Sequence, residues 1–192
     1  IIVSLCIFLY SASQLAPICL KLTPICLFFL LFYPYTKRFT FLCHYFLGVA
    51  LAMAPAGGYI AVTGELPFGI ILLSGGVCLW IGSFDVIYGS QDRQFDLDHK
   101  LHSMATQFGV ANAHKIAAFF HFISILCFIG AGIYFDLSFI YYIGVLIAIL
   151  TLIYQHSLIT PYDFSRLTQV YFMRNGIVSI VIFVFTLIDI LS

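Results

Sequence analysis

The chain has 192 residues, of which 62% are hydrophobic and 8% are charged, and its formal net charge is zero. A soluble domain carries about 25% charged residues, so this composition excludes a soluble globular protein. It predicts an all-α, polytopic transmembrane helical bundle with the lipid bilayer as a partner, and the zero net charge gives no reason to expect a nucleic-acid partner. Since no repeat or linker divides the sequence, residues 1–192 are predicted to form a single membrane domain.

About seven membrane spans are predicted, because crossing the hydrocarbon core takes roughly 20 apolar residues. The first two apolar runs are short, and proline residues separate and interrupt them. In chain order the expected spans are residues 1–15, 18–33, 41–63, 67–88, 111–135, 139–156 and 170–190.

Basic residues gather on one side of this predicted topology. The loops 34–40, 89–110 and 157–171 fall on the same side if all seven spans are real. With the adjoining helix ends they carry seven of the eight basic residues: Lys37, Arg38, Arg93, Lys100, Lys115, Arg166 and Arg174. By the positive-inside rule this side is expected to face the cytoplasm.

Three carboxylates lie at the end of the fourth apolar run: Asp85, Asp92 and Asp96. If the segment is one helix, these side chains share a face, whereas Asp98 falls on another face and is expected to be solvated. Asp92 and Asp96 are one helical turn apart and can reach the same Mg²⁺, which proteins commonly hold with one or two carboxylates plus substrate phosphates.

Asp85 lies about 10 Å deeper in the same run. A carboxylate at membrane depth needs a partner or a water-filled cavity, so we expect a polar cavity that opens at this end of the span. A second interpretation stays open, in which the stretch is only an acidic helix end whose charges are solvated or paired with Arg93 and Lys100.

Two further features are expected to belong to this cavity. Lys37 and Arg38 follow a span end on the same side, and such a pair either anchors the protein at the membrane interface or neutralises a diphosphate. Tyr88 lies one turn after Asp85 and is a candidate to line a substrate pocket, where an aromatic face stabilises a carbocation. A tyrosine at this depth would equally serve as an interfacial residue.

These residues also carry a resemblance to a known family. The stretch from Asp85 to Asp96 reads Asp-Val-Ile-Tyr-Gly-Ser-Gln-Asp-Arg-Gln-Phe-Asp, and His102-Ser103 and Phe108-Gly109 follow it. It resembles the second aspartate-rich motif of UbiA-type membrane prenyltransferases. The segments 33–40, Tyr-Pro-Tyr-Thr-Lys-Arg-Phe-Thr, and 48–64 are similar to parts of 4-hydroxybenzoate polyprenyltransferases. The resemblance runs over nearly the whole chain in the same order.

The resemblance implies a nine-helix enzyme that transfers a polyprenyl group from polyprenyl diphosphate to an aromatic acceptor, with Mg²⁺ as cofactor. It implies that Asp92 and Asp96 are catalytic metal ligands and that Lys37, accompanied by Arg38, binds the diphosphate. Asp85 is then the candidate for orienting the acceptor or the metal site.

One departure from the family pattern concerns the first aspartate-rich motif, an Asn-Asp-x-x-Asp-like run. No Asp or Glu precedes Glu65 in this chain, and seven spans are expected here where the family has nine. We therefore expect the domain to be incomplete at its N-terminus and to lack the first two helices. On this interpretation the chain alone lacks half of its metal ligands and could be inactive, and the function is that of the complete protein.

The acceptor and the pathway stay open. The segment 98–103, Asp-His-Lys-Leu-His-Ser, departs from the commonest pattern and looks more like a branch found with alternative menaquinone pathways. The expected reaction is transfer to a 4-hydroxybenzoate-like acceptor in ubiquinone or menaquinone biosynthesis, or to a different menaquinone-pathway precursor, at a bacterial cytoplasmic (inner) membrane. Two alternatives to this prediction stay open. Under these, the protein is either a non-catalytic truncated remnant or a cation-coupled transporter.

Overall fold

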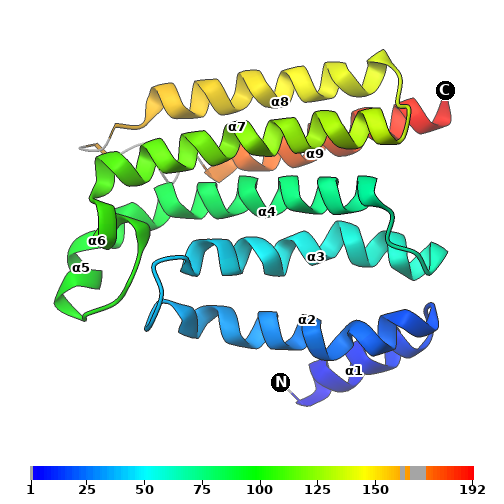
Figure 1. Cartoon of the computed structure of the whole chain (residues 1–192), viewed down its shortest axis with the longest axis horizontal. Coiled ribbons are helices and arrows are strands. Elements are labelled where there is room, and N and C mark those ends of the chain that lie inside the picture. Colours follow the sequence, from blue (N-terminus) through cyan, green and yellow to red (C-terminus); the bar gives the residue numbers. More distant parts are fainter. Residues whose placement is uncertain (1, 161–162, 165–171) are drawn as a thin grey trace.

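The computed structural model describes residues 2–160, 163–164 and 172–192, and this part of the chain forms an all-α bundle (Figure 1). Its elements are α1 (Ile2–Ser13), α2 (Pro17–Thr36), α3 (Cys43–Thr63), α4 (Phe68–Gly89), the 3-10 turn η1 (Ser90–Asp92), α5 (Arg93–Asp98), α6 (Met104–Phe108), α7 (Val110–Tyr134), α8 (Phe139–Leu158) and α9 (Phe172–Leu191). The predicted fold class is confirmed, and the long helices follow the predicted order of apolar runs.

The first predicted run, 1–15, contains the apolar helix α1, whose described part has 12 residues. This helix ends at the polar residue Ser13, Gln14 follows it, and Pro17 then starts the next helix. Among the described residues, five stretches are long and apolar enough to cross a membrane: α2, α3, Phe68–Asp98, α7 and α8. The part of α9 from Asn175 to Leu191 is apolar but shorter.

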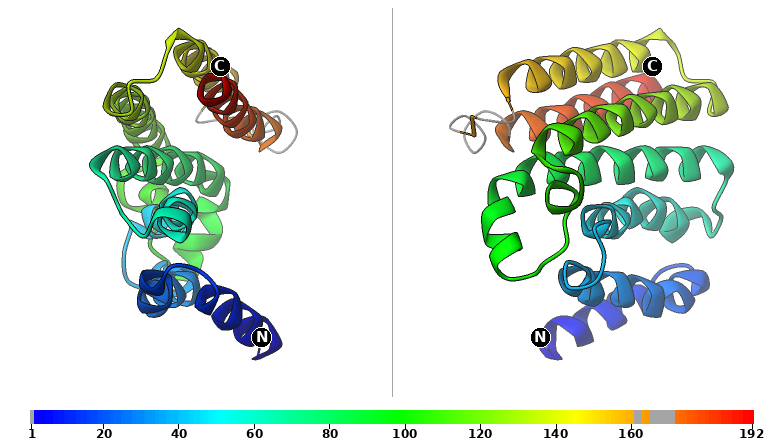
Figure 2. Two further views of the ribbon diagram at one scale, coloured as in Figure 1. Left: turned by 90° about the vertical axis from the view of Figure 1, so that its right-hand side faces the viewer. Right: turned by 60° about the vertical axis from the view of Figure 1, so that its left-hand side comes forward.

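Helix α4 holds the bundle together because it packs against both α3 and α7 (Figure 1). Glycines make these contacts close. A Cβ on Gly48 of α3 would lie 2.3 Å from the backbone oxygen of Cys78, and a Cβ on Gly76 would lie 2.7 Å from the ring of Phe128. Viewed along the helices, α7, α8 and α9 curve round so that α9 returns toward α3 and α4 (Figure 2).

The two ends of the bundle differ in their connections (Figure 1). Segments α5 and α6 and the α2–α3 connection lie at one end, here called the α5–α6 end, and the α3–α4 and α7–α8 turns lie at the other. The α5–α6 end holds five of the basic residues predicted to share a side: Lys37, Arg38, Arg93, Lys100 and Lys115. Arg166 lies outside the described residues, as does the side chain of Arg174.

The long connection at the α5–α6 end is fixed to the bundle. Ser103 caps α6 by accepting a hydrogen bond from the Thr106 amide at 3.2 Å, and Arg93 donates to the carbonyl of Ala105 at 3.0 Å. The His102 amide donates to the Lys37 carbonyl at 2.7 Å. A buried apolar cluster beneath this connection joins α4, α6 and α7 through Val86, Ile87, Met104, Ala105, Ala113 and Ala117. Side chains on this connection are therefore held in defined positions.

Candidate functional site

The acidic stretch is not one continuous helix, so the predicted single face for its three carboxylates is wrong. Helix α4 ends at Gly89, η1 forms a 3-10 turn, and α5 begins at Arg93. The Ser90 hydroxyl donates to the Val86 carbonyl at 2.7 Å where α4 ends. As a result Asp92 is exposed while Asp96 is fully buried. Asp98 is exposed, as predicted, and accepts a hydrogen bond from Gln94 at 2.9 Å.

Lys37 and Asp96 form the central ion pair of the site. Lys37 directly follows the last residue of α2, and its Nζ lies 2.8 Å from Oδ1 of Asp96. The Asp96 side chain is 0% exposed and that of Lys37 is 29% exposed. The partner of Asp96 is therefore Lys37, at the end of α2, rather than Arg93 or Lys100. A buried carboxylate needs such a partner because desolvation of an unpaired charge is costly.

A cavity of about 260 Å³ lies beside this pair. Predicted site residues from two helices and η1 line it, namely Lys37, Asp85, Tyr88 and Asp92. Tyr88 stacks on Phe84 with ring centroids 6.1 Å apart. Asp96 does not line the cavity itself, but its partner Lys37 does. The expected polar cavity at this end of the bundle is thus present.

The carboxylates offer part of a site for a divalent cation. Oδ2 of Asp96 is buried and has no hydrogen bond, and Asp92 is exposed at the cavity. Such hard oxygen atoms suit Mg²⁺, which keeps several waters and substrate phosphates as its other ligands. Within the described residues, no three His, Cys, Asp or Glu side chains come together as metal ligands. The described residues therefore offer a cation at most two neighbouring carboxylates, Asp92 at the cavity and the buried Asp96.

Arg38 is not brought to the cavity. Its guanidinium carbon lies 5.7 Å from the ring centroid of Tyr35, and both side chains are exposed. A guanidinium over an exposed aromatic ring at a helix end is typical of an anchor at the membrane interface. The structure thus separates two neighbouring basic residues that the sequence pattern treats as a pair.

His44 belongs to the site and was missed from the sequence. It lies in the first turn of α3, lines the cavity and is 3% exposed. Its Nδ1 lies 2.7 Å from Oδ2 of Asp85. The signal that could have found it is its position, since a histidine just inside an apolar span needs a polar partner.

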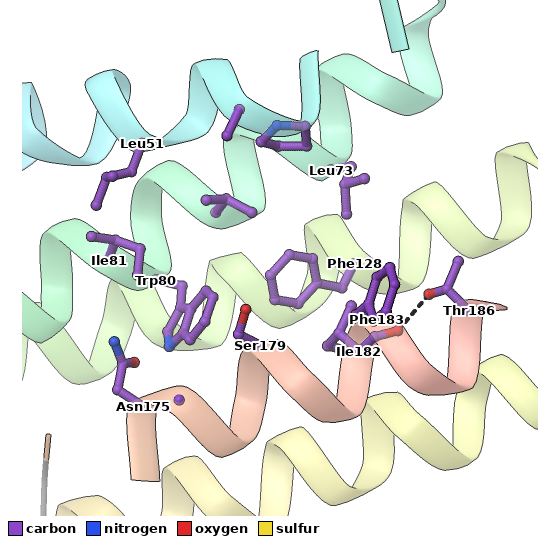
Figure 3. Close-up of a pocket in the computed structure, with 14 residues that line it drawn as sticks. Leu51, Leu73, Trp80, Ile81, Phe128, Asn175, Ser179, Ile182, Phe183 and Thr186 are labelled. Carbon is purple, nitrogen blue, oxygen red and sulfur yellow. Dashed lines mark hydrogen bonds between the residues drawn. The ribbon is translucent and has the colours of Figure 1, made fainter. Parts of the chain in front are cut away.

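Two larger cavities have mainly apolar linings. One, of about 600 Å³, lies between α3, α4, α7 and α9. In Figure 3 the rings of Trp80 and Phe128 lie opposite α9, with the Ser179 hydroxyl near them; the dashed line is the bond from Thr186 to the Ile182 carbonyl. The other, of about 420 Å³, lies between α1, α2 and α3. Both are hydrocarbon-like spaces within the bundle.

Comparisons with known proteins identify a family and several relatives. Residues 1–177 match the UbiA prenyltransferase family. A protein named 4-hydroxybenzoate octaprenyltransferase from Nitrosospira multiformis is 30% identical over 88% of this chain and 58% of its own length. One of the same name from Shewanella sediminis is 32% identical over 76% of this chain and 51% of its own length. The chain therefore spans a little over half the length of these relatives.

A solved structure is also similar. It is the apo structure of a UbiA homolog from Aeropyrum pernix K1, with a TM-score of 0.83 and 27% identity, and the match covers 96% of this chain and 69% of that one. The family match covers most of the sequence and includes every residue that lines the polar cavity. The chain is a multi-pass membrane protein that belongs to the UbiA prenyltransferase family.

Proposed function

We propose that the protein containing this chain transfers a polyprenyl group from polyprenyl diphosphate to an aromatic acceptor, in a Mg²⁺-dependent reaction. The observation that carries this proposal is the polar cavity of Lys37, Asp85, Tyr88 and Asp92, with Asp96 paired to Lys37, at one end of an apolar bundle. Charged ligands suit the cavity, and long apolar chains suit the bundle. A polyprenyl diphosphate combines the two.

Lys37, Asp92 and Asp96 are assigned to the diphosphate. Asp92 and Asp96 would hold Mg²⁺, which supplies positive charge against the leaving diphosphate. Lys37 lines the cavity and would add a second positive charge there. As the allylic C–O bond breaks, its electron pair passes to the diphosphate oxygen, and fixed positive charge at that point lowers the barrier.

Asp85 and Tyr88 are assigned to the reacting carbon atoms. Tyr88 lies one helical turn from Asp85 on α4, and its aromatic face would stabilise the cationic prenyl group. Asp85 would orient the acceptor by accepting a hydrogen bond from it. The new bond then forms between the prenyl carbon and an electron-rich ring carbon, which afterwards loses its proton.

The prenyl tail is assigned to the cavity between α3, α4, α7 and α9 (Figure 3). Its lining is dominated by leucine, isoleucine and aromatic side chains. Burial of the tail there is favourable at roughly 0.8 kcal/mol for each CH₂ group. Helix α4 contributes to both this cavity and the polar one, so head and tail of one substrate would lie along the same helix.

The acceptor is proposed to be 4-hydroxybenzoate-like, in ubiquinone or menaquinone biosynthesis, because the curated relatives carry the name 4-hydroxybenzoate octaprenyltransferase. The basic residues at the α5–α6 end favour a cytoplasmic site, and a bacterial inner membrane is the proposed location.

The proposal is tested with membranes that contain the protein expressed from its full reading frame. Radiolabelled polyprenyl diphosphate is supplied with 4-hydroxybenzoate, with a set of other phenolic acids, and with Mg²⁺ or EDTA. We expect Mg²⁺-dependent transfer to at least one phenolic acceptor. Absence of transfer to every acceptor, from a protein that is folded in detergent, would contradict the proposal and favour a non-catalytic membrane protein.

A further inference from the structure

His44 makes a hydrogen bond that the assigned chemistry does not use. Its Nδ1 lies 2.7 Å from Oδ2 of Asp85, across the interface of α3 and α4. A carboxylate only accepts hydrogen bonds, so Nδ1 carries the proton and donates. Among the described residues no other hydrogen bond to Asp85 is found, and its side chain remains 28% exposed beside the cavity. One oxygen of Asp85 is thus held by the protein, and the other is available.

The imidazole ring is held firmly in place. A Cβ added to Gly89 would lie 2.9 Å from Cε1 of His44, so the ring rests directly on the backbone of α4. Two further close contacts follow along the same interface, between Tyr45 and Gly82 and between Gly48 and Cys78. Asp85 and Gly89 are one helical turn apart on the same helix. Helix α4 therefore provides both the hydrogen-bond partner of the ring and the surface that it rests on.

Packing alone does not explain a histidine at this position. Its Nε2 is buried and has no partner among the described residues. A buried polar atom without a hydrogen bond lowers stability, and an apolar side chain of similar size would avoid that loss. A histidine at this position is accounted for if its hydrogen bond to Asp85 has a role in the cavity.

We propose that His44 is a positioning residue: its Nδ1–H bond fixes the Asp85 carboxylate so that the second oxygen faces the cavity and accepts a hydrogen bond from the hydroxyl of the aromatic acceptor. This inference rests on the proposed function. It assigns the acceptor subsite to the interface of α3 and α4, beside Gly89, and leaves the diphosphate with Lys37 and Asp92, which line the same cavity.

The test compares His44→Asn with His44→Leu in the full-length protein. Asparagine keeps a donor near the position of Nδ1, and leucine has nearly the same size without one. We expect His44→Leu to raise KM for the acceptor and lower kcat, by about 10-fold each. His44→Asn should stay within about threefold of wild type, and KM for the prenyl diphosphate should change little in either variant. Partial unfolding would lower apparent kcat alone and leave both KM values unchanged.

A combined variant tests whether His44 acts through Asp85. Substitutions at two residues that act through one interaction have non-additive effects. The double variant with His44→Leu and Asp85→Asn should therefore be no less active than Asp85→Asn alone. Gly89→Ala, which displaces the ring without removing a polar atom, should also raise KM for the acceptor. Additive losses, or equal effects of His44→Asn and His44→Leu, would overturn the inference.

A second measurement does not depend on activity. NMR of the protein with isotope-labelled histidine should show His44 protonated at Nδ1, and Asp85→Asn should shift that signal. If the wild type transfers no prenyl group, the proposed function fails, and the NMR signal still tests the His44–Asp85 bond. A His44 signal that Asp85→Asn leaves unchanged would overturn the pairing itself.

Discussion

The two ends of the bundle treat their carboxylates differently. At the end opposite α5 and α6, Asp189 of α9 accepts hydrogen bonds from the Ser138 hydroxyl, the Ser138 amide at 2.9 Å and the Tyr141 amide at 3.1 Å. These amides are free because they lie at the start of α8. Asp189 thus joins α9 to α8, and both of its oxygens are used within the protein.

At the α5–α6 end, three carboxylates have oxygen atoms that accept no hydrogen bond from the described residues. One oxygen of Asp96 is buried without a hydrogen bond, one oxygen of Asp85 is available, and Asp92 is exposed at the cavity. A carboxylate such as Asp189, whose two oxygens both accept hydrogen bonds within the protein, stabilises the fold. Carboxylates in a cavity that still have a free oxygen are suited to binding a ligand. One end of the bundle is thus structural and the other is suited to function.

The largest expected effect is on turnover. Asp92→Asn removes a charge from the cavity without removing a buried contact, so we expect prenyl transfer to fall on the order of 100-fold with little change in melting temperature. Asp189→Asn serves as the control at the opposite end and should leave kcat/KM within about twofold. Comparable losses in both variants would erase the distinction between the two ends.

Lys37 and Arg38 should differ although they are neighbours. Lys37→Met removes a charge from the cavity and leaves Asp96 buried without its partner, a loss that typically costs about 3–5 kcal/mol. We expect poorer binding of prenyl diphosphate together with a lower melting temperature. Arg38→Met, at an exposed site over Tyr35, should leave diphosphate binding within about twofold of wild type and the melting temperature nearly unchanged. Equal effects on prenyl diphosphate KM would restore Arg38 as a diphosphate ligand.

Helix α3 contains one tightly packed glycine, Gly48, and one glycine in open space, Gly57. Alanine substitutions at these two positions test whether the two halves of α3 differ in packing. A Cβ on Gly48 would meet the Cys78 backbone at 2.3 Å, but a Cβ on Gly57 meets nothing within 4 Å. We expect Gly48→Ala to reduce the free energy of unfolding by about 1–3 kcal/mol, and Gly57→Ala to be neutral or slightly stabilising. Thermal melting in detergent measures the stability of both variants. A destabilising Gly57→Ala would show that the C-terminal half of α3 is tightly packed too.

The smallest effect concerns Asp189 itself. Its replacement by alanine removes the acceptor of the Ser138 and Tyr141 hydrogen bonds at the start of α8, and loss of such a cap lowers stability. The melting temperature should fall slightly while activity per folded molecule stays at the wild-type level. A clear loss of activity in the folded fraction would mean that this end also contributes to function.

Much of the fold follows from local sequence signals. The apolar runs predict the order of the long helices, and the break between α3 and α4 falls where Gly64 adopts a φ of 74° just before Pro67. The run 1–15 is apolar on average, and its helix α1 ends at Ser13, just before Gln14. Periodicity could not show that α4 stops at Gly89, because polar residues at helix spacing fit a continuous helix equally well.

The site is only partly predictable from the sequence. Residue type and position identify Lys37, Asp85, Tyr88 and Asp92, and these residues line one cavity. The pairing of Lys37 with Asp96 and of His44 with Asp85 joins residues 59 and 41 positions apart in the chain. Such pairs depend on how α2, α3 and α4 pack, which local patterns do not encode.

The most direct test of the account is equilibrium binding of radiolabelled geranyl diphosphate to the purified full-length protein, with and without Mg²⁺. The account predicts Mg²⁺-dependent binding to the wild type and to Asp189→Asn, and its loss in Asp92→Asn and Asp96→Asn. Equal binding to all four proteins would contradict the assignment of the diphosphate to the cavity at the α5–α6 end.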